Sequence, residues 1–186
     1  GGGERAGEVR AGWSVGPWSN GLETHIGGSR DGRWDVGVGF NRYDVNFDDG
    51  SDSTFNEYAP FARFFLVKEE EGGAPVSLSL NAQLFVDDYP AAGDKGKFVQ
   101  AGATVYKSLK ITDNFELQPF PGFAFVAESY TFGGDDADTA QYLTRDFGLH
   151  FTTATDAPWI WRATLLEQSF RRETYRALRL AVVRRM

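Results

Sequence analysis

The 186-residue sequence contains no cysteine and only two histidines, His25 and His150. Without cysteine, neither a disulfide framework nor a thiolate metal site can form. Two histidines are too few for a histidine-rich metal centre, so we expect neither a metal nor a cofactor. The formal net charge is −7, and nucleic-acid binding requires a basic face. We therefore expect no nucleic-acid partner.

Long apolar runs are also missing. No stretch of eighteen apolar residues occurs, so the sequence contains no candidate for a membrane-spanning helix. The mildly polar average would suggest a soluble protein, but barrel strands alternate lipid-facing and lumen-facing residues and hide their hydrophobicity from an average. The 22 glycines and 15% aromatic residues are typical of closely packed β architecture. The sequence begins at Gly1 without a methionine, which is what removal of a secretory signal would leave.

The clearest pattern lies in residues Val76 to Asp87. One parity of this segment reads Val, Leu, Leu, Ala, Leu, Val, and the other reads Ser, Ser, Asn, Gln, Phe, Asp. Successive side chains of a strand point to opposite faces. The segment is therefore predicted to be a strand with one apolar face and one polar face.

The same period of two returns along the whole chain. It is strong in residues 9–16, 34–41, 99–106 and 143–151, and weaker in 22–28, 58–67, 117–132, 159–170 and 175–186. These segments, with the one above, make ten candidate strands and no convincing helix. Nothing in the composition marks a boundary, so residues 1–186 are expected to form a single domain.

The connections between these segments differ in length. Short turns are expected at 31–32, 71–73, 112–114 and 155–158, and longer acidic loops at 46–57, 88–97 and 133–141. The two classes alternate, as they do in outer-membrane barrels with short turns at one end and long loops at the other. The predicted fold is therefore all-β, an up-and-down antiparallel transmembrane β-barrel of ten strands, with eight as the alternative.

Two features favour a membrane barrel over a soluble one. The polar parity is dominated by small residues, which suit a narrow interior, whereas a soluble barrel would turn Lys and Glu toward water. Aromatic residues stand near the predicted strand ends, as in interfacial girdles; they are Trp34, Phe115, Trp159 and Trp161 beside short turns and Tyr43, Phe47, Tyr58 and Phe132 beside long loops. A soluble, lipocalin-like carrier of an apolar ligand is the alternative.

With this pattern the chain resembles the small outer-membrane β-barrel families of the OmpA-like and OmpW-like type. The segments Val105–Leu109 and Leu117–Gly122 have the look of a hairpin in those families. The resemblance implies the bacterial outer membrane, lipid and lipopolysaccharide as surroundings, and protein partners in the envelope. The final residues Val182–Met186 lack the aromatic ending common in such proteins. Pro119 and Pro121 each remove a ladder donor, so a bulge or a late strand start is expected there.

Charged residues on the predicted inward parity form the candidate functional cluster. They are Arg10, Glu23, His25, Asp35, Arg63, Glu128, Asp146, Arg162 and Arg179. Buried charges must pair, because an unpaired one costs several kcal/mol. Paired charges would plug and stiffen the barrel; the functional alternative is a selective narrow pore. We expect a structural or interaction role, or a narrow passive pore.

Two groups of residues could suggest catalysis. Asp87–Asp88 resembles the paired aspartates of omptin proteases, but Asp146 and His150, four residues apart on one face, are predicted to lie toward the opposite end. His150 with Thr152 lacks a third orienting group. A barrel enzyme acting on lipid or peptide is therefore the third alternative, and no catalytic residue is assigned.

Acidic residues cluster in the predicted loops. They are Asp48, Asp49, Asp52 and Glu57 in one loop and Asp135, Asp136 and Asp138 in another. Such carboxylates can bind Ca²⁺ or Mg²⁺ weakly, but no EF-hand spacing is present. Solvated acidic loops are the default expectation.

Overall fold

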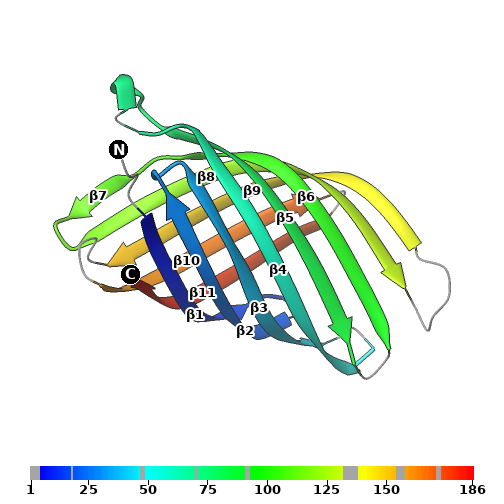
Figure 1. Ribbon diagram of the computed structural model, residues 1–186. Coiled ribbons are helices and arrows are strands. Elements are labelled where there is room, and N and C mark those ends of the chain that lie inside the picture. The colour runs from blue at the N-terminus through cyan, green and yellow to red at the C-terminus, as the bar shows by residue number, and fades with distance from the viewer. Residues whose placement is uncertain are drawn as a thin grey trace.

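The computed structural model describes residues 5–17, 19–46, 49–69, 71–90, 93–131, 138–153, 158–170 and 173–186. They form one closed β-barrel (Figure 1). The strands are β1 (Arg5–Val15), β2 (Ser19–Arg30), β3 (Trp34–Asn46), β4 (Asp52–Val67), β5 (Ser77–Tyr89), β6 (Asp94–Tyr106), β7 (Leu109–Thr112), β8 (Phe115–Thr131), β9 (Asp138–Thr153), β10 (Trp159–Phe170) and β11 (Glu173–Arg185). A 3₁₀ turn, η1 (Glu71–Gly73), lies between β4 and β5.

Ten of these strands make the barrel. Each pairs antiparallel with its neighbours along the chain, β6 pairs with β8, and β1 pairs with β11 to close the ring. The seam is extended by mutual backbone hydrogen bonds of 3.0 and 2.9 Å between Gly7 and Met186. The predicted ten-stranded, up-and-down barrel is confirmed, and the eight-stranded alternative is wrong.

The barrel has two ends, which we call the base and the mouth. At the base β1 begins and β11 ends, so both termini lie there with the connections 31–33, 68–76 and 107–114 (Figure 1). At the mouth β1 ends and β2 begins. Asp49 and Gly93 lie at the mouth, whereas Gly32, Gly72 and Asp113 lie at the base, as the alternation of connections predicted. Asp136 and Asp156 are outside the described residues.

The predicted lengths of these connections are wrong. β4 already begins at Asp52, and the β5–β6 pair continues to Tyr89 opposite Asp94. The predicted loops 46–57 and 88–97 therefore shrink to 47–51 and 90–93, shorter than 68–76 at the base. The outward side chains near the mouth are polar, among them Arg42, Asn56 and Asp88. The apolar alternation fades there although the hydrogen-bond ladder continues.

The bulge or late start expected at the prolines is also wrong. β8 runs from Phe115 in unbroken register with β9 through Pro119 and Pro121. Its ladder with β6 stops at Gly122 opposite Thr104. The carbonyl of Pro119 accepts a 3.2 Å bond from the Lys107 N–H, so this edge of Pro119 faces the connection after β6. The ladder between β6 and β8 therefore ends at the prolines, while the ladder between β8 and β9 is unaffected.

The four-residue strand β7 was not predicted. It pairs only with the start of β8, beside the base of the ring, and Figure 1 shows it at the end that carries the termini. All four of its residues are exposed. With no buried face, β7 has no alternation for a sequence pattern to reveal.

The two faces of the barrel wall have opposite character. Inward Ser79 is fully buried, whereas its neighbour Leu80 faces outward with 47% of its surface exposed. Outward apolar residues surround the barrel as an apolar belt: Trp13, Leu22, Ile26, Trp34, Val36, Phe40, Tyr58, Leu80, Val99, Phe123, Phe125, Leu143, Phe147, Phe151, Trp161, Leu165, Leu178 and Leu180. Within the described ranges, no helix is long and apolar enough to cross a membrane.

Candidate functional site: the lumen

The barrel encloses a cavity of about 700 Å³, and side chains from all ten strands of the ring line it. The lining runs from Glu8 and Arg162 near the base to Phe55 and Tyr175 near the mouth. Most of it is polar, in contrast to the apolar belt outside. The lumen is thus neither an apolar core nor fully occupied by side chains.

Seven of the nine predicted inward charges line this cavity. They are Arg10, Glu23, His25, Arg63, Asp146, Arg162 and Arg179. The other two bond to lining residues: Asp35 pairs with Arg63, and Glu128 accepts a 2.7 Å hydrogen bond from the Tyr142 hydroxyl. The nine charged residues, which were chosen because they share the inward parity of the strands, therefore all lie in the lumen or bond to residues that line it.

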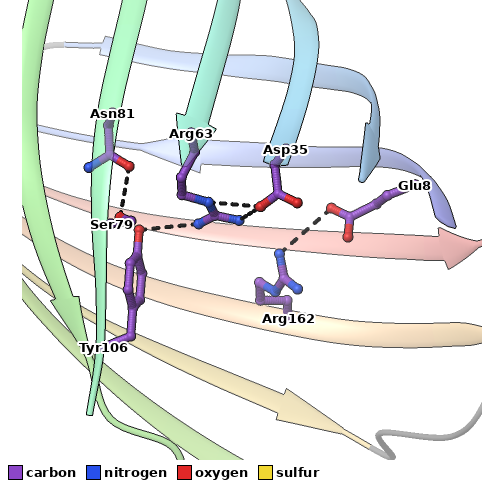
Figure 2. A network of polar contacts seen from close by, with 7 residues as sticks. All are labelled: Glu8, Asp35, Arg63, Ser79, Asn81, Tyr106 and Arg162. Atoms are coloured by element: carbon purple, nitrogen blue, oxygen red, sulfur yellow. Dashed lines mark hydrogen bonds and ion pairs between the residues drawn. The ribbon is translucent and has the colours of Figure 1, made fainter. Parts of the chain in front are cut away.

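At the base, Arg63 is the centre of a polar network (Figure 2). Its Nε donates to Asp35 Oδ2 at 2.8 Å, and its Nη1 donates to the Tyr106 hydroxyl at 3.1 Å. Arg162 Nη1 and Glu8 Oε1, 3.8 Å apart, form a second and looser ion pair. Figure 2 shows both pairs, Arg63 with Asp35 and Arg162 with Glu8. Two arginines at the base are therefore paired with carboxylates.

Aromatic packing completes the base. The Phe120 ring stacks on His150 with centroids 4.3 Å apart and on Tyr106 at 5.9 Å. Gly148 makes this possible, because a Cβ at that position would collide with the Phe120 ring. His150 Nδ1 lies 2.7 Å from Thr164 Oγ1. The imidazole is therefore held by a hydroxyl on β10 and a ring on β8.

Halfway along the lumen, Glu23 is shared by two partners. Tyr43 donates to its Oε1 at 2.6 Å, and Arg179 Nε lies 3.2 Å from the same oxygen. At the base beside Arg63, Asn81 Nδ2 donates to Thr104 Oγ1 at 2.7 Å, and Ser79 donates to Asn81 Oδ1 at 2.9 Å. These bonds fix polar side chains along the wall and leave the centre open.

Three cavity-lining carboxylates were absent from the predicted cluster: Glu8, Glu57 and Asp87. Glu57 and Asp87 stand directly opposite each other on β4 and β5, near the mouth. The inward parity could have found Glu57, because it continues Arg63, Phe61 and Ala59. Its assignment to an acidic loop hid it.

Among the described residues, those considered for catalysis or metal binding are not brought together into a site. Asp87 lies toward the mouth, and His150 lies toward the base and bonds Thr164. In the described part of the chain, no group of three or more His, Cys, Asp or Glu side chains is arranged to hold a metal ion. Asp52, Glu57 and Asp138 belong to strands, not loops, which corrects that expectation. Asp48, Asp135 and Asp136 are outside the described residues.

No protein-family model matches the sequence, and no curated protein is similar to it. Solved structures are similar in fold. The translocator domain of the autotransporter NalP from Neisseria meningitidis has a TM-score of 0.54 at 9% identity, covering 100% of this chain and 89% of that one. The KdgM porin in complex with disordered oligogalacturonate has a TM-score of 0.46 at 8% identity, covering 95% of this chain and 98% of that one. Ail of Yersinia pestis in a phospholipid bilayer nanodisc has a TM-score of 0.44 at 12% identity, covering 98% of this chain and 100% of that one. This chain shares the β-barrel fold of bacterial outer-membrane proteins.

Proposed function

We propose that the protein is an integral barrel of the bacterial outer membrane whose lumen is a narrow passive pore for small hydrophilic solutes. The observation that carries the proposal is the polar cavity of about 700 Å³ lined by all ten strands of the ring. A lumen filled by its own side chains, as in a purely structural barrel, would leave no such space.

The apolar belt supports the membrane part of the proposal. Soluble monomers rarely expose contiguous apolar patches larger than a few hundred Å², and here large side chains such as Trp161 and Phe123 are 66% and 56% exposed. Lipid and lipopolysaccharide are the surroundings that fit this surface. A soluble carrier of an apolar ligand would need the opposite arrangement, with apolar side chains inside.

Lipid contact can be measured by fluorescence quenching. A variant that keeps Trp161 as its one tryptophan should be quenched by lipids with brominated chains in reconstituted vesicles. A matched variant keeping only Trp13, which lies nearer the mouth on the same outer face, should be quenched by bromines at a different depth. Absence of quenching at every depth would show that the belt does not meet lipid.

The base network sets the width of the proposed pore. The Glu8–Arg162 pair, at 3.8 Å, is looser than the Asp35–Arg63–Tyr106 group beside it. Removing the looser pair should widen the passage and leave the stronger network intact. The solutes that pass would be small and hydrophilic, because they must form hydrogen bonds with these charged groups in place of water.

Single-channel recording in planar bilayers tests the pore. The wild type should conduct, and the double variant Glu8→Ala/Arg162→Ala should conduct more. The matched control is Glu167→Ala/Arg176→Ala, which removes an ion pair of 2.7 Å on the outer face. Its conductance should stay at the wild-type level. The pore proposal fails if neither the wild type nor the Glu8/Arg162 variant conducts.

Catalysis does not enter this proposal. We propose that Asp146 and His150 do no chemistry, because the hydroxyl bonded to His150 Nδ1 belongs to Thr164, which is buried. Loss of an activity in His150→Ala, with folding intact, would contradict this.

A further inference from the structure

The charges that line the cavity are unevenly distributed around the ring. Four consecutive strands, β10, β11, β1 and β2, contribute three guanidinium groups but only two carboxylates to the lining. We call these five residues the basic wall: Glu8, Arg10, Glu23, Arg162 and Arg179. This side of the lumen therefore has one more positive than negative charge.

Both carboxylates of the basic wall already have an arginine partner. Glu8 Oε1 lies 3.8 Å from Arg162 Nη1 (Figure 2), and Glu23 Oε1 lies 3.2 Å from Arg179 Nε. The third guanidinium, that of Arg10, is attracted by both glutamates. Among the described residues, however, the Arg10 side chain forms neither an ion pair nor a hydrogen bond. The surplus positive charge is therefore located on Arg10.

The Arg10 side chain can be reached from the cavity. Arg10 lines the cavity and is only partly buried, and its guanidinium nitrogens, unlike Nε of Arg162, retain solvent-accessible surface. The row across the strands continues from Arg10 to His25 and Gly39, which also line the cavity. A Cβ added to Gly39 would meet no atom closer than 3.6 Å, so no neighbouring side chain fills this part of the wall.

The other carboxyl groups that line the cavity do not neutralise Arg10. Glu57 and Asp87 stand on β4 and β5 and hydrogen-bond to each other. Asp146 stands on β9 and is hydrogen-bonded to polar side chains beside it. None of the three is among the groups that act most strongly on Arg10. The position beside Arg10 is therefore open to a negative charge from outside the protein.

The geometry of a guanidinium group indicates which anion fits best. Its N–H groups form a planar fork that donates two parallel hydrogen bonds to one carboxylate. An enclosed charge without a partner is costly, so a carboxylate that pairs with Arg10 is stabilised. A cation at the same place would meet a like charge.

We propose that Arg10 is a binding site for the carboxylate group of small organic acids, so that the proposed pore favours such acids among hydrophilic solutes. Both carboxylate oxygens accept hydrogen bonds from the Arg10 guanidinium, and the rest of the solute lies in the open cavity. Preference during passage rests on the proposed function, whereas binding rests on the basic wall alone.

Calorimetric titration of the whole refolded protein in detergent micelles tests the site, with sodium acetate as the probe. Saturable binding is expected in the wild type. Arg10→Gln should weaken it about tenfold, because one charge-assisted pair is lost. Arg10→Lys keeps the charge without the fork and should bind with intermediate affinity. The matched control Arg176→Gln changes an arginine on the outer face and should bind as the wild type does.

A variant of opposite sign sharpens the titration. Glu8→Gln leaves Arg162 without its carboxylate and adds a positive charge to the basic wall. Acetate should therefore bind roughly twofold more tightly, through the attraction of a second unpaired guanidinium. Slower migration of boiled than of unheated samples on a gel checks that each variant is folded.

Reversal potentials in planar bilayers, under a gradient of potassium acetate, test the preference during passage. The permeability ratio of acetate to potassium should fall about twofold in Arg10→Gln. The proposal is overturned if acetate does not bind the wild type, if Arg10→Gln changes neither affinity nor permeability ratio, or if Glu8→Gln binds more weakly. A protein that binds acetate through Arg10 but does not conduct would contradict the proposed pore and leave the binding site established.

Discussion

The base and the mouth of the lumen solve the problem of enclosed charge in opposite ways. At the base, carboxylates face guanidinium groups, as Asp35 faces Arg63. At the mouth, Glu57 faces Asp87 in register, and the two carboxyl groups hydrogen-bond to each other. The difference shows that ten strands of one wall can pair unlike charges at one end and place two carboxyl groups opposite each other at the other. Neutralising one charge should therefore have opposite effects on stability at the two ends.

The largest effect is expected at the base. Arg63→Met leaves Asp35 without its partner and should destabilise the barrel by about 2 kcal/mol, below the roughly 3–5 kcal/mol of a fully buried pair, because the Arg63 side chain is 32% exposed. Urea unfolding in lipid vesicles measures the change.

The matched substitution is Arg176→Met, which breaks a pair on the outer face whose arginine side chain is 76% exposed. Exposed pairs contribute about 0–1 kcal/mol. If the two variants were equally stable, the charges at the base would not be structurally coupled.

A smaller effect of opposite sign is expected at the mouth. Glu57→Gln gives the hydrogen-bonded Asp87 an amide N–H donor in place of a second acidic group, and it keeps a carbonyl oxygen for the Asn41 amide. It should stabilise the barrel by about 0.5 kcal/mol, within the usual range for cross-strand pairs. The same unfolding assay applies. Asp35→Asn, the equivalent change at the base, should destabilise, and a loss of stability in both variants would end the contrast between the ends.

The smallest effect concerns pH and lies in the connections at the base. Ion pairing with Lys107 and a 2.8 Å bond from the Ser108 N–H hold the pKa of Glu69 below its ordinary value of 4.5. A carboxylate whose pKa is lower in the folded state stabilises that state above its ordinary pKa, and this contribution is lost as pH falls through the folded value. Glu69→Gln should therefore cost about 0.5 kcal/mol at pH 7, and the cost should shrink as pH falls below 4.5 and vanish once pH is below the lowered pKa of the folded state.

Asp113→Asn is the control for the pH experiment. Asp113 pairs with Lys110 at 3.2 Å, but its side chain is 97% exposed. Its unfolding curve should follow that of the wild type at every pH. A Glu69→Gln difference that stays constant from pH 7 to pH 3 would rule out the ionised carboxylate as its source.

The contrast between the two ends was only partly visible in the sequence. The alternation of apolar and polar residues predicted all ten strands of the ring and showed which side chains point inward, because the two faces of the wall meet different surroundings. It did not give the strand ends near the mouth, where outward residues such as Arg42 and Asp88 are polar and no alternation remains. Glu57 was placed in a loop for this reason, and the carboxyl pair at the mouth was missed.

The size of the lumen could not be predicted from the sequence pattern either. Parity tells which side chains point inward, but the space between them depends on how far the strands stagger around the ring. The sequence argument favoured a plug of paired charges. The structure has the ion pairs at the base together with an open cavity. Gly148 illustrates the limit, since only the folded structure shows which ring its missing side chain admits.

The seam between β1 and β11 has a consequence for the order of assembly. It joins residues from opposite ends of the sequence, such as Trp13 and Leu180, whereas the remaining ladders join segments that are near neighbours along the chain. Closing so long a loop is entropically costly and slows folding. Until the last strand arrives, β1 offers an open edge beside an exposed apolar face, the combination most prone to aggregation. Closure of this seam is therefore expected to be the last step in forming the barrel.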